Sequence, residues 1–520
     1  MIKDKFLRGA LILTLAGLAV KIIGSVNRIL LSRLLGGEGI GLYQIAYPIY
    51  LLIISISAAG FPVAISILVA RKVAQEDYWG ANRIFKVSLC FMAVTGLSFA
   101  LILYGAAGLL VEWQIIRDAR AYLALVSLTP AVFFATILAS FRGYFQGHQL
   151  MTPPAISQII EQFVRVMTML ALAYYLLPRG LEYAAAGAAF GAVPGSITGL
   201  VVLSCFYVYY HKSWSQKFAA AKEAAIEPVG KIAWSLVRLA IPVSCANLMI
   251  PVVTGIDMLI VPSRLEVAGF TVVEATTAFG YLAGMALPLV MMATIPTTSL
   301  AASVVPAISE AHALGNKSAI GDKSYTAVRL CCLVTLPAAV GMWALATPIS
   351  RLLYGTAAAG PSIANLAPSI FLLGLHQVTT GILQGLGMTL TPMLNMLVSA
   401  LAKIFFVWNL TALPQYNIVG AAWASNLNFA VAAGLNIFFL MKYAKVSLPL
   451  KAGGRILLLS GIMGIVVALL YQRVLQPLLS LVPATLLAVI AAVVVYLLLL
   501  LLTGEIDKKQ IYKLLQNRGK

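Results

Sequence analysis

Apolar stretches of about 20 residues follow one another from the beginning of the chain to its end, separated by short polar segments. A helix of about 20 apolar residues crosses a hydrocarbon core of about 30 Å, because it rises about 1.5 Å per residue. We therefore predict an all-α polytopic membrane protein with fourteen transmembrane helices. The expected ranges are 6–35, 42–70, 84–111, 121–141, 154–177, 183–210, 232–261, 273–305, 326–346, 364–385, 391–411, 417–441, 456–475 and 481–503.

Composition agrees with this prediction and excludes a soluble protein. The 520 residues are 61% hydrophobic and 10% charged, whereas about a quarter of a soluble domain is charged. The mean hydropathy is +0.95. We expect the first apolar run not to be a cleaved signal, because it is about 30 residues long and lacks a small-residue cleavage site.

The positions of the basic residues predict the orientation in the membrane. When residues near the ends of the spans are counted with the adjoining loops, the termini and the loops on their side hold 24 Lys plus Arg, the opposite loops hold 7 and the interiors of the spans hold 5. Basic loops stay on the cytoplasmic side. We therefore predict a multi-pass protein of the cell membrane with both termini in the cytoplasm. The formal net charge of +19 then reflects topology and contact with membrane lipids, and we expect no nucleic-acid partner.

The sequence contains an internal repeat. The stretch "FQGHQLMTPPAISQIIEQFVR" (145–165) returns 238 positions later as "LQGLGMTLTPMLNMLVSALAK" (383–403), and weaker echoes occur at shifts of 243 and 233. Two six-helix lobes around a central cavity, followed by two further helices, are the simplest interpretation, and such repeats are typical of transporters. The expected parts are an N-lobe (1–210), a cytoplasmic linker (211–231), a C-lobe (232–445) and a final part with the last two helices and a cytoplasmic tail (446–520).

Charged residues inside the first predicted span are the main candidates for a functional site. Lys21 and Arg28 are seven positions apart, which places them within about 20° of one helix face. A charge at mid-span costs about 2.5–3.5 kcal/mol on insertion scales. This face should therefore line a water-filled cavity. A snorkelling role for either residue, or pairing of either with Asp257, is the structural alternative.

Further charges lie in the fifth, seventh and eleventh predicted spans. Glu161 and Arg165 are four positions apart, in the order that favours an ion pair on a helix. In the eleventh span Asn395, Ser399 and Lys403 share one helix face with no acid on that helix, and Lys403 stands at the position that repeats Arg165. Arg238 and Asp257 lie in the seventh span. Away from their ends, the spans then hold five cations and two acids, so we expect the chamber to bind an anion.

The chain shows no sign of an enzyme. No phosphate-binding GxxxxGK[ST] loop occurs, and the four His residues are scattered. We therefore expect neither cofactor nor metal. Coupling to the membrane potential, or to Na⁺ or H⁺, is left open.

Two stretches carry a family resemblance. "SRLLGGEGIGLYQIAYPIY" (32–50) and "VVPAISEAHALGN" (304–316) resemble the stage V sporulation protein B group. That group is similar to the MurJ-type lipid II flippases, within the superfamily that also holds polysaccharide flippases and MATE drug exporters. The resemblance implies that the family's cationic motif in the first helix falls on Lys21 and on Asn27–Arg28. The Arg that MurJ-type members carry early in the eighth helix has no counterpart in "AFGYLAGMALP" (278–288).

The resemblance implies a flippase that moves an undecaprenyl-pyrophosphate-linked peptidoglycan precursor outward, for the cell wall or the spore cortex. Cell-wall synthesis proteins are then candidate partners, and we expect a monomer. Three alternatives stay open: a flippase for lipid-linked polysaccharide repeat units, a MATE-type exporter and a scaffold without transport. The first two predicted spans, 6–35 and 42–70, contain no acid to hold a coupling cation, which disfavours the exporter.

Overall fold

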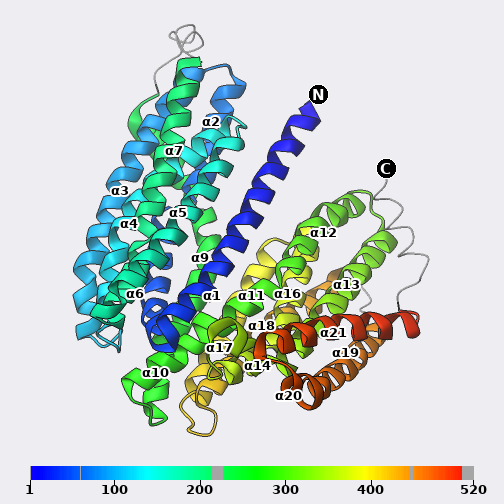
Figure 1. Cartoon of the computed structure of the whole chain (residues 1–520). Helices are drawn as coiled ribbons and strands as arrows, with labels where there is room; N and C mark the ends of the chain where they lie inside the picture. The colour runs from blue at the N-terminus through cyan, green and yellow to red at the C-terminus, as the bar shows by residue number, and fades with distance from the viewer. Residues whose placement is uncertain (1, 59, 214–226, 445–448, 506–520) are drawn as a thin grey trace. The chain divides into compact units, whose positions relative to one another are not determined.

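The computed structural model describes residues 2–58, 60–213, 227–444 and 449–505, and this part of the chain is helical, without strands (Figure 1). Contacts divide the chain into two compact units, 1–280 and 281–520. The predicted lobe boundary at the linker 211–231 lies mostly outside the described residues. The predicted domain limits therefore stay predictions.

The first unit is built from long helices. They are α1 (Ile2–Ser57), α2 (Phe61–Ala74), α3 (Tyr78–Glu112), α4 (Ala121–Gly147), α5 (Thr152–Leu176), α6 (Leu181–Phe190), α7 (Ala192–Ser213), α9 (Val229–Val267) and α10 (Val272–Phe279). Helix α3 packs on α4, and α7 packs on both α4 and α5 (Figure 1). Gly36 has a positive φ of 66° and kinks α1, a conformation that favours glycine. This kink separates the first two predicted spans.

A π-helical segment, Gly280–Ala286, lies at the boundary between the units, and all of it except Gly280 belongs to the second unit. Its helices are α11 (Leu287–Ala293), α12 (Ile295–Ala313), α13 (Lys317–Ala344), α14 (Ala346–Tyr354), α15 (Gly360–Leu366), α16 (Pro368–Gly385), α17 (Leu390–Leu410), α18 (Asn417–Phe439), α19 (Leu450–Leu470), α20 (Gln476–Leu478) and α21 (Leu481–Leu502). Two more π-helical segments, Leu440–Ala444 and Tyr471–Leu475, follow α18 and α19. Helix α19 packs against α13 and α21 (Figure 1).

The helices confirm a polytopic membrane protein. Among the described residues, 12 helices are long and apolar enough to cross a membrane. One of these, Leu15–Ala74, covers two predicted spans, and α9, the predicted seventh span, is not among the 12. The predicted count of fourteen is therefore not confirmed, and the orientation of the termini stays a prediction.

Close glycine contacts place the two halves of the repeat in register. A Cβ on Gly143 would lie 2.8 Å from the carbonyl oxygen of Pro62, and one on Gly381 would lie 2.8 Å from that of Ala301. Gly147 and Gly385 make the corresponding contacts one turn later. In the first unit α4 therefore approaches the backbone of α2 through paired glycines, and in the second unit α16 approaches α12 in the same way.

This register confirms the shift of 238 and corrects one of the weaker echoes. The glycines of α4 and α16 are 238 positions apart, and the carbonyls that they meet are 239 apart. The echo at 243, which pairs residues 64–66 with 307–309, lies about one helical turn out of this register. Those residues share a helix face, but they are not equivalent positions.

An ionic cluster ties the segment between α3 and α4 to the rest of the first unit. Arg120 donates to Asp118 at 2.8 Å and contacts Glu38 at 2.5 Å, and Thr276 of α10 donates to Asp118 at 3.0 Å. The hydrogen bond to Asp118 raises the pKa of Arg120 above its usual range. This cluster joins α1, α10 and the segment before α4.

The glycine contacts predict a stability difference. Gly143→Ala and Gly381→Ala should each lower the melting temperature of the detergent-solubilised protein, because overpacking typically costs about 1–3 kcal/mol. Gly105→Ala is the matched control, since nothing lies within 4 Å of its added Cβ. Differential scanning fluorimetry measures the three variants. Equal melting temperatures for all three would contradict the close approach.

Candidate functional site

A cationic face on α1 begins the candidate site in the first unit. Lys21 is exposed and Arg28 is half-buried. The Arg28 guanidinium carbon lies 5.6 Å from the centre of the Tyr47 ring, within the range of a cation–π interaction. Tyr47 belongs to the part of α1 beyond the Gly36 kink, so the kink folds an aromatic side chain back onto the arginine.

Asn27 packs against a neighbouring helix. Its side-chain nitrogen lies 3.5 Å from the sulfur of Met169 on α5, and the residue is only 5% exposed. Its Oδ1 atom is buried without a hydrogen-bond partner among the described residues, and an unmade bond of this kind costs about 1–3 kcal/mol. Asn27 therefore contacts α5 beside the cationic face.

Glu161 of α5 joins two arginines and is the electrostatic centre of the first unit's site. Arg165 Nη2 donates to Glu161 Oε1 at 2.8 Å, one turn along the same helix. Arg142 of α4 donates to the other carboxylate oxygen at 2.5 Å. The predicted Glu161–Arg165 pair is confirmed, and α4 adds a second arginine to it.

Three tyrosines of α1 surround this cluster. Tyr43, Tyr47 and Tyr50 all interact electrostatically with Arg165, and the rings of Tyr43 and Tyr47 stack at 5.2 Å. Tyr43 and Tyr50 are buried. Phenol rings present both a π-face and a hydroxyl to a cation. Arg28 and Arg165 thus lie near aromatic side chains of α1.

The second unit holds the predicted residues of α17. Asn395, Ser399 and Lys403 are all buried, with Lys403 only 3% exposed. Asn395 Nδ2 donates to Asn436 Oδ1 of α18 at 2.8 Å. Their burial places this polar face against protein, and its place in a water-filled chamber stays a prediction.

The remaining predicted charges lie on α9. Asp257 is half-buried and Arg238 is exposed. Lys403 belongs to the second unit, whereas the other candidate residues belong to the first. The convergence of Lys403 with Lys21, Arg28 and Arg165 on one chamber therefore stays a prediction.

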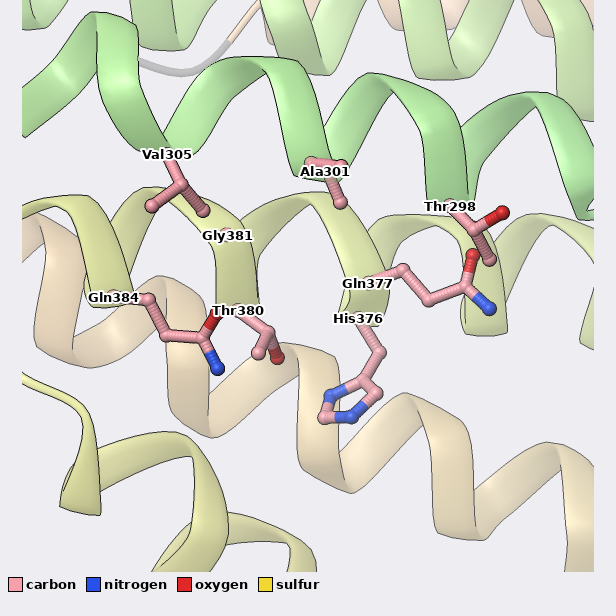
Figure 2. Close-up of a pocket in the computed structure, with 9 residues that line it drawn as sticks. Thr298, Ala301, Val305, His376, Gln377, Thr380, Gly381 and Gln384 are labelled. Carbon is pink, nitrogen blue, oxygen red and sulfur yellow. The ribbon is translucent and has the colours of Figure 1, made fainter. Parts of the chain in front are cut away.

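A polar pocket lies between α12 and α16 in the second unit. It has a volume of about 240 Å³, and Figure 2 shows its lining side chains. The lining residues are Thr298, Ala301, Ala302, Val305, His376, Gln377, Thr380, Gly381 and Gln384. None of them has a permanent charge. This pocket thus differs in chemistry from the arginine cluster of the first unit.

Sequence reasoning missed Arg142 and the polar pocket. The fourth span was expected to end at residue 141, which placed Arg142 in a cytoplasmic loop, but α4 continues to Gly147. The "FRG" at 141–143, just ahead of the repeated Gln-Gly, was the available signal. The pocket residues His376, Gln377 and Thr380 lie inside the predicted span 364–385. The sequence of a single span does not tell which helix face packs against a neighbouring helix and which face lines a pocket.

Comparisons with known proteins agree with this architecture. The chain is 31% identical to stage V sporulation protein B of Bacillus subtilis (strain 168), over 87% of this chain and 86% of that protein. It is 29% identical to the lipid II flippase MurJ of the same organism, over 89% and 88%.

Two solved structures share the fold. A lipid II flippase MurJ in an inward closed conformation aligns with a TM-score of 0.70 at 15% identity, covering 94% of this chain and 98% of that one. An inward-facing MATE family multidrug transporter aligns with a TM-score of 0.68 at 15% identity, covering 82% and 94%.

Family profiles cover both units. The MatE profile matches residues 242–408, and the profile described as polysaccharide biosynthesis protein matches residues 6–312, more than half of the chain. The chain therefore belongs to the polysaccharide biosynthesis protein family, in the group of stage V sporulation protein B and the MurJ-type flippases.

Proposed function

We propose that this protein is a flippase that moves an undecaprenyl-pyrophosphate-linked peptidoglycan precursor, lipid II, from the cytoplasmic to the outer leaflet by alternating access. The observation that carries the proposal is the cluster of cations around Glu161. The relative named lipid II flippase MurJ supports the substrate class, and the relative named stage V sporulation protein B supports a role in sporulation.

The charge of the cluster favours an anionic ligand. Arg142 and Arg165 share a single carboxylate, that of Glu161, and Lys21 and Arg28 add two more cations on α1. Buried charge of one sign is costly unless a counter-charge is supplied. A diphosphate supplies this counter-charge, and its oxygens accept hydrogen bonds from the arginine N–H groups in a bidentate geometry.

Glu161 keeps two guanidinium groups in place before the ligand arrives. Arg142 and Arg165 each direct one nitrogen to a different carboxylate oxygen. A guanidinium has five N–H groups, so most of its hydrogen-bonding capacity remains for phosphate. This arrangement lowers the entropy cost of binding, because the donors are already ordered.

The membrane potential supplies a driving force in this mechanism. An inside-negative potential favours outward movement of anionic charge by about 2.3 kcal/mol per charge per 100 mV. The sugar–peptide headgroup crosses in water between the lobes while the polyprenyl tail stays in lipid. We propose that Lys403 completes the site from the second unit.

The same cluster disfavours export of cationic drugs. A cation-coupled exporter needs an accessible acid in the membrane to hold H⁺ or Na⁺. In the first unit, the Glu161 carboxylate is already occupied by two guanidinium groups. The polysaccharide repeat-unit alternative uses the same diphosphate chemistry, so the charges do not distinguish it from lipid II.

Alanine variants test the anion site. In vesicles that contain a fluorescent undecaprenyl-diphosphate-linked substrate, we expect Arg28→Ala, Arg165→Ala and Lys403→Ala each to slow flipping by about tenfold or more, equivalent to about 1.4 kcal/mol. Lys21→Ala, at an exposed position, should have a smaller effect. Arg33→Ala is the matched control, because Arg33 is an exposed cation on the same helix. Flipping at the wild-type rate in all four site variants would remove the proposed site.

The identity of the lipid tests the substrate. Native mass spectrometry of protein extracted gently from its own membrane should show a bound undecaprenyl diphosphate that carries the peptidoglycan disaccharide and peptide. A mass that corresponds to a polysaccharide repeat unit would favour the alternative flippase. Co-purification of that lipid should be reduced in Arg165→Ala and retained in Arg33→Ala.

A further inference from the structure

The pocket between α12 and α16 has one polar wall and one apolar wall. Helix α16 contributes His376, Gln377, Thr380 and Gln384, whereas α12 contributes small or apolar side chains next to Thr298 (Figure 2). Amide and hydroxyl groups both donate and accept hydrogen bonds. Such walls match a ligand with a hydroxyl- or amide-rich edge and an apolar face.

Buried partners hold the polar wall from behind. Asn436 Nδ2 lies 3.3 Å from His376 Nδ1 and 3.0 Å from Thr380 Oγ1, while Asn395 holds the other end of the Asn436 amide. Thr297 Oγ1 lies 2.6 Å from Gln377 Oε1. Groups held in this way bind a ligand with little loss of side-chain entropy.

His376 adds an imidazole ring to the polar wall. Asn436 Nδ2, which has two N–H groups, lies within 3.3 Å of three acceptors, Thr380 Oγ1, Thr379 Oγ1 and His376 Nδ1. A neutral imidazole ring offers one donor nitrogen and one acceptor nitrogen. Together with the Thr380 hydroxyl, it forms a neutral hydrogen-bonding pair one turn apart on α16.

The repeat shows that this neutral wall replaces different chemistry in the first unit. At the shift of 238, Thr380 corresponds to Arg142, and His376 and Gln377 correspond to Leu138 and Ala139. In the first unit the corresponding face of α4 therefore carries Arg142 and Gln146, the counterpart of Gln384, beside two apolar residues. The same place in the fold is charged in one half and uncharged but polar in the other.

We propose that the α12–α16 pocket binds an uncharged, N-acetylated sugar of the lipid-linked headgroup. The proposal rests on the proposed function and extends it, because the arginine cluster takes the diphosphate and this pocket takes the neutral part. A sugar ring offers an apolar C–H face to Ala301 and Val305 and its hydroxyl and acetamido groups to α16. At about 240 Å³, slightly below the usual range of about 300–1,000 Å³ for ligand pockets, the space suits one part of a larger ligand.

Two lipids of different headgroup test this assignment. One is undecaprenyl diphosphate, and the other is undecaprenyl diphosphate that carries an N-acetylated disaccharide. The dissociation constant of each is measured for the full-length protein in nanodiscs. Gln377→Leu and Thr380→Val remove polar groups from the wall, and Ser299→Ala is the matched control, an exposed residue of α12 outside the pocket.

A third variant separates occlusion from loss of a buried network. Ala302 lines the pocket and is exposed, so Ala302→Leu narrows the pocket without removing a buried hydrogen bond. Melting temperatures of all variants identify any that fail to fold. This variant keeps the test decisive if Gln377→Leu or Thr380→Val destabilises the protein.

We expect the three pocket variants to bind the disaccharide lipid about tenfold more weakly than wild type, and the bare lipid within about twofold. Wild-type affinity for the disaccharide lipid in every variant, or equal losses for both lipids, would overturn the assignment. Failure of the wild type to bind either lipid would instead contradict the proposed function. In that case the binding of the free N-acetylated disaccharide is measured. Binding that Ala302→Leu abolishes would support the pocket assignment, and absence of binding would overturn it.

Discussion

The first unit depends on a carboxylate that holds two guanidinium groups. Glu161 pairs with Arg165 on its own helix and with Arg142 on α4, and all three side chains are at most 22% exposed. Removing one partner of a buried ion pair typically costs about 3–5 kcal/mol, because the other charge is left uncompensated. This constraint fixes α4 against α5 and leaves the cluster with excess positive charge. The structural role and the capacity to bind an anion therefore have the same origin.

The two halves of the chain use one packing scheme for different chemistry. Paired glycines on α4 and α16 meet the backbones of α2 and α12 at equivalent positions. On this common scaffold, Arg142, Glu161 and Arg165 of the first half correspond to Thr380, Ser399 and Lys403 of the second. Thr380 and Ser399 carry uncharged hydroxyl groups, which cost less to bury than ions, whereas Lys403 keeps a buried cation in the second half.

Sequence alone predicted the features that depend on local pattern. Apolar runs located the helical regions, and the spacing of Glu161 and Arg165 predicted their ion pair. The predicted spans 42–70, 183–210, 273–305 and 364–385 are each divided between helices. Features that depend on tertiary contact were beyond its reach. Arg142 is 19 positions from Glu161 on another helix, and the Asn436 network joins α16, α17 and α18. The number of spans also depends on tertiary structure, because the kink at Gly36 and the helix breaks around α11 determine where one span ends and the next begins.

The most direct test of the account is an experimental structure of the protein with undecaprenyl diphosphate bound in a lipid environment. We expect diphosphate density within hydrogen-bonding distance of the guanidinium groups of Arg28 and Arg165, with the ion pair between Glu161 and Arg142 intact. Diphosphate held elsewhere, with Arg28 and Arg165 turned toward lipid or toward protein alone, would contradict the central claim that this cluster receives the anionic substrate.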